Sequence, residues 1–139
     1  MCHTAPVTQP TQRELNRKRT QAEILRVARE HLGTVGAAAL SLRAVARDLG
    51  MVSSAIYRYV DSRDELLTRL IDDAYNSMAD AVDAATTEPP EGSPLEQWMS
   101  AAHAIRDWAL EHRHEYALVY GSPVPGYEAP ERTSVSGTR

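Results

Sequence analysis

The stretch at 41–63, SLRAVARDLGMVSSAIYRYVDSR, constrains the fold more than any other part of this chain. Ser41 can cap the N-terminus of a short helix. Four apolar residues of that helix recur at helical spacing and share one face: Leu42, Val45, Ala46 and Leu49. Gly50 then allows a sharp turn, because glycine adopts a positive φ at little cost. A second short helix is predicted over about 52–59, and the pair forms a helix-turn-helix, whose second helix can enter the major groove of DNA.

Composition and charge indicate an all-α chain with one basic half. Alanine is abundant, phenylalanine is absent, and apolar residues recur at helical spacing. Residues 1–70 contain 11 Arg+Lys and 7 Asp+Glu, a charge of +4, whereas residues 71–139 contain 4 and 12, a charge of −8; together they give the −4 of the whole chain. The helix-turn-helix lies in the basic half, which favours a nucleic-acid-binding head on a non-binding body. A chance fluctuation of charge is the alternative.

The chain is expected to divide into four parts. Residues 1–12, rich in Pro, Thr and Gln, are predicted to be a disordered tail. Residues 13–62 form the head with the helix-turn-helix. Residues 63–121 form a connecting helix and the start of a helical body. Residues 122–139, with prolines, glycines and no apolar period, are predicted to be loop-like or disordered.

Start and stop signals place the flanking helices. The first helix is predicted from about Arg13 or Arg19 to Leu32, ended by Gly33 and Gly36. Ser62 and Glu65 form a capping box that opens a helix of about 23 residues, or roughly 35 Å. The run TTEPPEG at 86–92 then breaks the pattern and is predicted to be a linker.

The next helix has a complete N-terminal signal, with Ser93 as the cap, Pro94 at the first position and Glu96 at the third. Its apolar face extends to about Leu110. The run EHRHEYALVY is predicted to be a last short helix, closed by Gly121.

With its flanks, GAAALSLRAVARDLGMVSSAIYRYVDSRDELL resembles the DNA-binding module of the TetR family of transcriptional regulators, and the preceding ILRVAREHLGTVG is similar to that family's first helix. The resemblance covers about residues 19–70. It implies that an N-terminal helical domain binds operator DNA, while a C-terminal helical domain forms a dimer and binds a small ligand that releases the DNA. The first hypothesis is therefore a ligand-responsive repressor that acts on a palindromic operator as a homodimer.

The resemblance also implies which residues contact DNA phosphates. The family positions that donate to phosphates are matched here by Tyr57, Tyr59 and Arg63. The family more often has His at the position of Tyr59 and Lys at the position of Arg63. Ser41 matches the capping position, where a hydroxyl and a helix N-terminus can hold a phosphate. For Tyr57, a core position is the alternative. Val60 stands where the family usually has Phe, which leaves a smaller core contact.

Base reading is expected from the exposed side of the second helix and from Arg43 nearby. The candidates on that helix are Val52, Ser53, Ser54, Ala55 and Arg58. The family commonly has Ser at the position of Val52. The valine therefore removes one polar contact and shifts the capping of the second helix toward Ser53. Arg43 is the strongest candidate, because bidentate reading of guanine is worth about 1–3 kcal/mol of discrimination. Arg58 follows, and a phosphate or solvent contact is the alternative for both.

A basic run lies at the start of the first helix and contains Arg13, Arg17, Lys18 and Arg19. It can contact DNA phosphates or the minor groove. A solvated helix end is the equally good alternative.

The body offers weaker candidates. Six residues are candidates for an apolar ligand pocket: Trp98, Met99, His103, Trp108, Tyr116 and Tyr120. Aromatic residues at helical spacing are more often core residues. His112 and His114 lie two apart and point in different directions on a helix, so a shared metal is not expected.

The sequence carries no feature of an enzyme, metal site or cofactor site: a nucleophile–base pair, a glycine-rich phosphate loop and metal-ligand spacing are all missing. The single cysteine, Cys2, excludes an intramolecular disulfide. Neither a secretory signal nor an apolar run of the ~20 residues that a membrane span requires is found. A cytoplasmic location is therefore expected.

One departure from the family pattern concerns the body. The family usually has several further helices, the last two of which form the dimer interface, whereas this chain ends after a proline-rich tail. A fragment, a truncated product and a dimer made in another way remain open. The second hypothesis is therefore a truncated helical module that pairs with a full-length relative and does not bind DNA alone.

Overall fold

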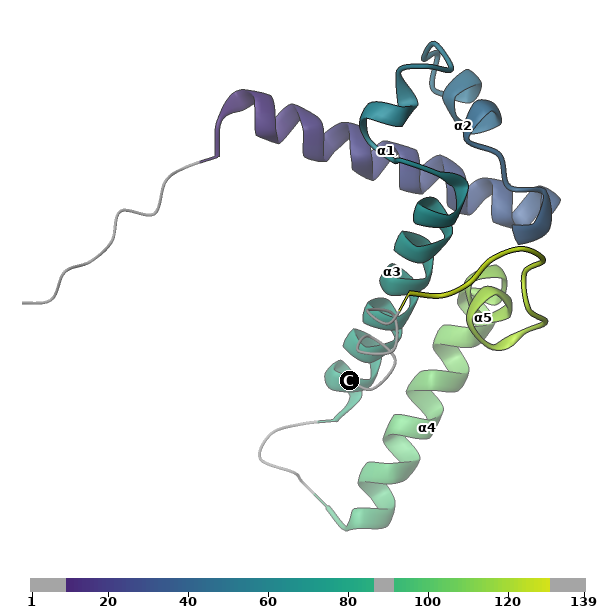
Figure 1. The fold of residues 1–139 in the computed structure, drawn as a ribbon. Coiled ribbons are helices and arrows are strands. Elements are labelled where there is room, and N and C mark those ends of the chain that lie inside the picture. Colours follow the sequence, from purple (N-terminus) through teal and green to yellow (C-terminus); the bar gives the residue numbers. More distant parts are fainter. Residues whose placement is uncertain (1–9, 87–91, 131–139) are drawn as a thin grey trace, which may run out of the picture.

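The structure, a computed structural model, describes residues 10–86 and 92–130. These residues form helices and loops, without a β-strand, which confirms the predicted all-α class (Figure 1). The elements in order are α1 (Gln12–Val35), η1 (Ala37–Ala39), α2 (Leu42–Asp48), η2 (Ile56–Arg58), α3 (Arg63–Ala85), α4 (Pro94–Glu111) and α5 (Arg113–Tyr120), where η marks a 3₁₀ helix. The head contains α1 to η2 and the first turns of α3, and the body contains the rest of α3 with α4 and α5.

Helix α1 begins earlier and ends later than predicted. Thr11 and Glu14 form a reciprocal capping box, in which the Thr11 amide donates to Glu14 Oε2 at 2.7 Å. The last two residues of the predicted tail therefore belong to the start of a helix, and residues 1–9 lie outside the described part. Gly33 lies inside α1, and Gly36 ends it with a φ of 78°.

The helix-turn-helix differs from prediction in its second half. Helix α2 is capped by Ser41 as expected, and Gly50 makes the turn with a φ of 67°. Instead of a helix over 52–59, however, residues 53–55 form a turn, followed by the single 3₁₀ turn η2. We call residues 52–59 the recognition segment. Its backbone hydrogen bonds join residues three positions apart; for example, the Ala55 amide donates to the Val52 carbonyl at 2.8 Å. Serine and β-branched residues favour such local turns over a continuous helix.

A hydrophobic core joins α1, α2, η2 and the start of α3. Its fully buried members include Ile24, Val45, Ile56, Leu66 and Leu70. Val60 is also buried, so the smaller residue at the position where the family usually has Phe still fills a core site. This core holds the recognition segment against α1 and α3.

Helices α3 and α4 lie side by side and run in opposite directions (Figure 1). Ser62 caps α3 by accepting from the Glu65 amide at 3.1 Å, and Ser93 and Glu96 form the predicted capping box of α4. Trp108 of α4 is buried and its indole Nε1 donates to Ser77 Oγ of α3 at 2.9 Å. The predicted linker at 86–92 falls mostly on residues 87–91, which lie outside the described part.

One arginine of the head bonds to two helices of the body. Arg29 of α1 donates from Nη2 to Asp73 of α3 at 2.5 Å and from Nε to Glu115 of α5 at 3.1 Å. Close by, Gly33 lets α5 approach, since an added Cβ would lie 3.2 Å from the His114 ring. Together, α1, α3 and α5 therefore meet at a polar and closely packed junction.

Residues 121–130 have no regular structure, as predicted for a loop, but they are not detached from the body (Figure 1). The hydroxyls of Tyr127 and buried Thr68 lie 2.9 Å apart, and Val124 packs against the core. This segment therefore covers part of α3, while residues 131–139 lie outside the described part. No helix among the described residues has the length and apolar character to cross a bilayer.

Candidate nucleic-acid interface

The recognition segment exposes the side chains that would read DNA and buries the one that anchors it. Val52 is 72% exposed and Tyr57 is 46% exposed, and Ser53, Ser54 and Arg58 are exposed as well. Ala55 is half-buried, and Ile56 is completely buried in the core of the head. One apolar anchor thus holds a strip of exposed polar residues on the surface.

Arg43 lies at the centre of this surface. It borders two adjoining hollows, one shared with Ser41, Val52 and Ser53, the other with Ser53, Ser54 and Tyr57. The predicted contacts from α2 and from the recognition segment are therefore brought together. Ser41 Oγ accepts weakly from the Ala44 amide at 3.5 Å, so Ser41 caps the N-terminus of α2 as predicted.

Arg63 is placed differently from the sequence-based expectation. Its Nε donates to the Leu40 carbonyl at 3.1 Å, and its Nη2 donates to the carbonyls of Ala37 and Ala38 at 3.0 and 3.1 Å. The guanidinium thereby satisfies the carbonyl groups of η1 and of the residue before Ser41. These bonds engage Nε and Nη2, and Nη1 lies 3.6 Å from Asp64 Oδ1, so Arg63 has a structural role in this geometry, while the phosphate contact stays a prediction. The sequence gives no signal for this role, because the partners are backbone groups more than 20 residues away.

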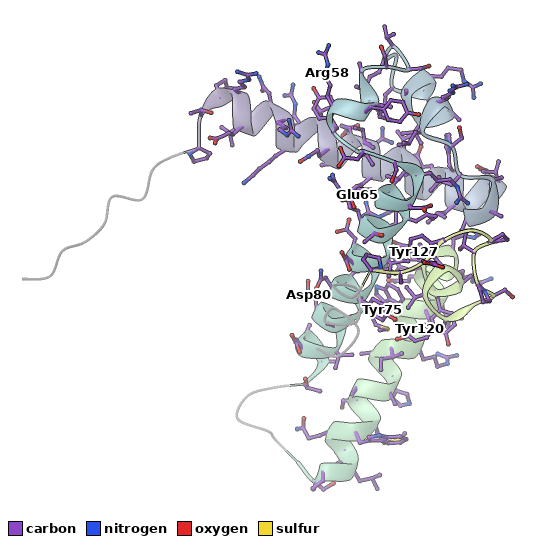
Figure 2. The ribbon with its side chains drawn as sticks, in the orientation of Figure 1. Arg58, Glu65, Tyr75, Asp80, Tyr120 and Tyr127 are labelled. Carbon is purple, nitrogen blue, oxygen red and sulfur yellow. The ribbon has the colours of Figure 1, made fainter. Side chains whose placement is uncertain are left out.

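Tyr59 is half-buried rather than displayed toward solvent. The Arg17 guanidinium of α1 lies over its ring, 5.8 Å from the centroid, and Arg17 Nη2 donates to the Arg58 carbonyl at 3.0 Å. Arg17 therefore ties α1 to the end of η2, although it is exposed like its neighbours Lys18 and Arg19. Figure 2 shows Arg58 at the outer end of the head, far from the body.

The carboxylate of Asp48, in the last turn of α2, is held by two neighbouring side chains. His31 Nε2 lies 2.6 Å from Asp48 Oδ2, and Arg47 Nε donates to Asp48 Oδ1 at 3.4 Å. The hydrogen bond from His31, with a smaller contribution from Arg47, holds the pKa of Asp48 below its ordinary value of 3.8. The contact also connects α1 to the C-terminal end of α2.

The six residues predicted to line a ligand pocket differ in burial and are spread along α4 and α5. Trp108 is a core residue, and its indole stacks on His112 with ring centroids 4.9 Å apart. Trp98, Met99 and His103 are exposed on α4. Tyr116 and Tyr120 of α5 contact each other at 5.1 Å, and Tyr120 meets Tyr75 of α3 edge-on at 6.2 Å (Figure 2). Partial burial, with Tyr75 and Tyr116 nearby, raises the pKa of Tyr120.

A different hollow lies between α3, α5 and the 121–130 segment. Its lining includes Ile71, Tyr75, Leu118, Val124 and Tyr127. None of the six predicted residues belongs to this lining. Val124 and Tyr127 were missed because they lie in a stretch whose composition predicts a loop, and a loop's contacts are not encoded by any periodicity.

The fold and the exposed recognition segment define a helix-turn-helix protein. Residues 24–70 match the family described as "Bacterial regulatory proteins, tetR family", and residues 98–139 match "Tetracyclin repressor-like, C-terminal domain". The chain belongs to the TetR family, as its sequence resemblance indicated.

Individual relatives agree with this assignment. HTH-type transcriptional regulator Rv1816 of Mycobacterium tuberculosis is 49% identical over 140 residues, which is 100% of this chain and 58% of that protein. The crystal structure of the protein SCO4313 superposes with a TM-score of 0.81 at 43% identity, over 93% of this chain and 60% of that one. A protein of unknown function from Rhodococcus sp. RHA1 gives a TM-score of 0.72 at 26% identity, over 97% and 64%. The chain thus spans 58% of the length of the curated relatives it matches.

Proposed function

We propose that the chain is a sequence-specific DNA-binding regulator of transcription that acts as a repressor on a palindromic operator. The observation that carries this proposal is the exposed recognition segment, anchored by buried Ile56 and adjoining Arg43. A segment held by one apolar anchor presents its polar side chains in a fixed arrangement, which base reading requires. The name of the relative Rv1816 agrees with this proposal.

The exposed side chains have different roles in the proposed complex. Arg43 reads base edges, assisted by Ser53 and Ser54, because an arginine can donate two bonds to guanine. Tyr57 donates from its hydroxyl to a phosphate and so positions the head without reading sequence. A palindromic operator requires two heads, hence a homodimer.

The experiment compares two substitutions on selected DNA sequences. Arg43→Ala should relax the preference at one or two base positions, at a cost of about 1–3 kcal/mol on the preferred sequence. Tyr57→Phe keeps the ring and loses the hydroxyl, so it should weaken binding to all sequences by a similar factor. The measurement is binding to a library of single-base variants. An unchanged base preference in the Arg43 variant would refute its reading role.

The proposed regulation is by a small effector that lowers DNA affinity. The hollow between α3, α5 and the 121–130 segment supports this part, because α3 runs from that hollow to the recognition segment. An effector that separates Tyr127 from Thr68 would act directly on α3. The test is a screen for compounds that raise the melting temperature and weaken DNA binding together. Compounds that stabilise the chain without changing DNA affinity would contradict this coupling.

A second function, pairing with a longer relative of the family, is supported by the outer face of α4. This face carries large apolar side chains that remain exposed: Leu95 (67%), Trp98 (65%), Met99 (40%), Ile105 (39%) and Leu110 (48%). An exposed apolar face of a helix is normally covered by another element. The distinguishing test is co-expression with a full-length relative: stable co-purification, with no DNA affinity of this chain alone, favours the second function.

A further inference from the structure

A second basic site lies where α1 meets the end of the recognition segment. A hollow at this junction is lined by Arg13, Asn16, Arg17, Thr20, Arg58 and Tyr59. Three guanidiniums, a carboxamide and two hydroxyl groups thus surround one space, and its lining includes no carboxylate. The four residues from α1 recur at i, i+3, i+4 and i+7, so they share one face of the helix. We call this hollow the arginine cleft.

The arginines of the cleft differ in their partners from six other arginines of the chain. Arg26, Arg29, Arg47, Arg63, Arg69 and Arg106 all form ion pairs with carboxylates. Among the residues that the structure describes, Arg13, Arg17 and Arg58 pair with no carboxylate. Glu14, next to Arg13, is engaged with Thr11 in the helix cap. The cleft therefore keeps its positive charge.

Arg17 is an exposed residue, but its guanidinium makes two contacts within the cleft. Its bond to the Arg58 carbonyl and its position over the Tyr59 ring fix the C-terminal end of η2. This end carries the Arg58 side chain, which projects from the outer end of the head (Figure 2). Arg13 lies one helical turn before Arg17 on the same face. Two exposed guanidiniums, Arg13 and Arg58, thus flank a third that holds the backbone in place.

We propose that the arginine cleft binds one phosphate of the DNA backbone, outside the groove that the recognition segment enters. Arg13 and Arg58 donate to the phosphate, because planar guanidiniums match its oxygens. Arg17 is a positioning residue that sets the direction of Arg58. This inference rests on the proposed function and adds a specific contact to it. Of the four basic residues at the start of α1, Arg13 and Arg17 line the cleft, whereas Lys18 and Arg19 lie outside its lining.

The experiment measures affinity for the selected DNA as a function of salt, between about 50 and 200 mM. Each neutralised phosphate contributes about 0.9 to the slope of log affinity against log salt. Arg13→Ala should therefore weaken binding to every sequence and lower the slope by about one. Lys18→Ala and Arg19→Ala remove the same charge from the same helix and should change the slope by less than half as much. Arg26→Ala, on the same helix but paired with Glu23 and Glu30, is the control and should bind like the unsubstituted chain.

The positioning role of Arg17 requires a separate readout. Arg17→Ala should weaken binding at least tenfold in the unsubstituted chain and less than threefold when Arg58 is already alanine, since its effect passes through Arg58. Equal effects in both backgrounds would refute the positioning role. Equal changes of slope for Arg13, Lys18 and Arg19 would refute the cleft as a phosphate site. If Arg43→Ala weakens binding while Arg13→Ala behaves like the Arg26 control, the cleft proposal alone fails; if the unsubstituted chain binds no DNA, both proposals fail.

Discussion

The two tryptophans of α4 give the most direct test of how the body is held together. Trp108 is only 4% exposed, and its indole donates to Ser77 Oγ, whereas Trp98 of the same helix is 65% exposed. Trp108→Phe removes about three buried heavy atoms, worth roughly 2 kcal/mol at about 0.8 kcal/mol per methylene. It also removes one hydrogen bond, worth about 1 kcal/mol. The expected loss in the free energy of unfolding is therefore about 3 kcal/mol.

The same substitution at Trp98 is the matched control and should change stability by less than about 0.5 kcal/mol. Urea unfolding followed by circular dichroism measures both variants. With a slope of about 2 kcal/mol/M, the midpoint of the Trp108 variant should fall by about 1.5 M. Ser77→Ala should cost about 1 kcal/mol alone and almost nothing in the Trp108→Phe background. Equal losses at Trp98 and Trp108, or an additive effect of Ser77, would refute the packing of α4 on α3 described here.

Three further substitutions test the head and the segment that covers α3. Gly50→Ala should lower stability by about 1–2 kcal/mol, because alanine is strained at a φ of 67° even though the site has open space; a melting curve measures this. Asp48→Asn should destabilise the chain at neutral pH, and this loss should shrink as the pH falls below 3.8, because the carboxylate held by His31 has a lowered pKa and its stabilising effect disappears as acid protonates it; a loss in urea midpoint that stayed the same as the pH fell would contradict this. Tyr127→Phe breaks the bond to Thr68 and should speed proteolytic cleavage within 121–130, while global stability falls by about 1 kcal/mol or less; an unchanged cleavage rate would contradict the contact.

The elements of this fold were predictable wherever a local signal determines them. Gly50 requires a positive φ, and Ser93 with Glu96 satisfies the first amides of α4, so both features follow from a few neighbouring residues. Helix α1 was predicted too short because the cap formed by Thr11 and Glu14 lies in a stretch whose composition favours disorder. The recognition segment was predicted as a continuous helix, although its serines stabilise turns equally well.

The contacts that connect distant parts of the chain could not be predicted in the same way. Arg63 bonds to carbonyls of η1, and Arg17 bonds to the Arg58 carbonyl, but an arginine next to a DNA-binding motif gives no sign of which partner it will meet. Trp98 and Trp108 are the same residue type on the same helix, and only the position of α3 decides which one is buried. Sequence therefore predicted which residues of the head share an exposed surface, while the contacts of the individual cations depend on the folded arrangement, and DNA binding by this surface stays a prediction.

Selection of genomic DNA fragments by the purified chain tests the proposed function most directly. The bound fragments are sequenced after selection at about 50 mM and about 200 mM salt, because non-specific phosphate contacts weaken steeply over this range. Sequence-specific binding predicts an enriched palindrome, with half-sites about one helical turn apart, that persists at the higher salt. Absence of any enriched sequence at both salt concentrations would contradict DNA binding by this chain and favour pairing with a longer relative through the outer face of α4.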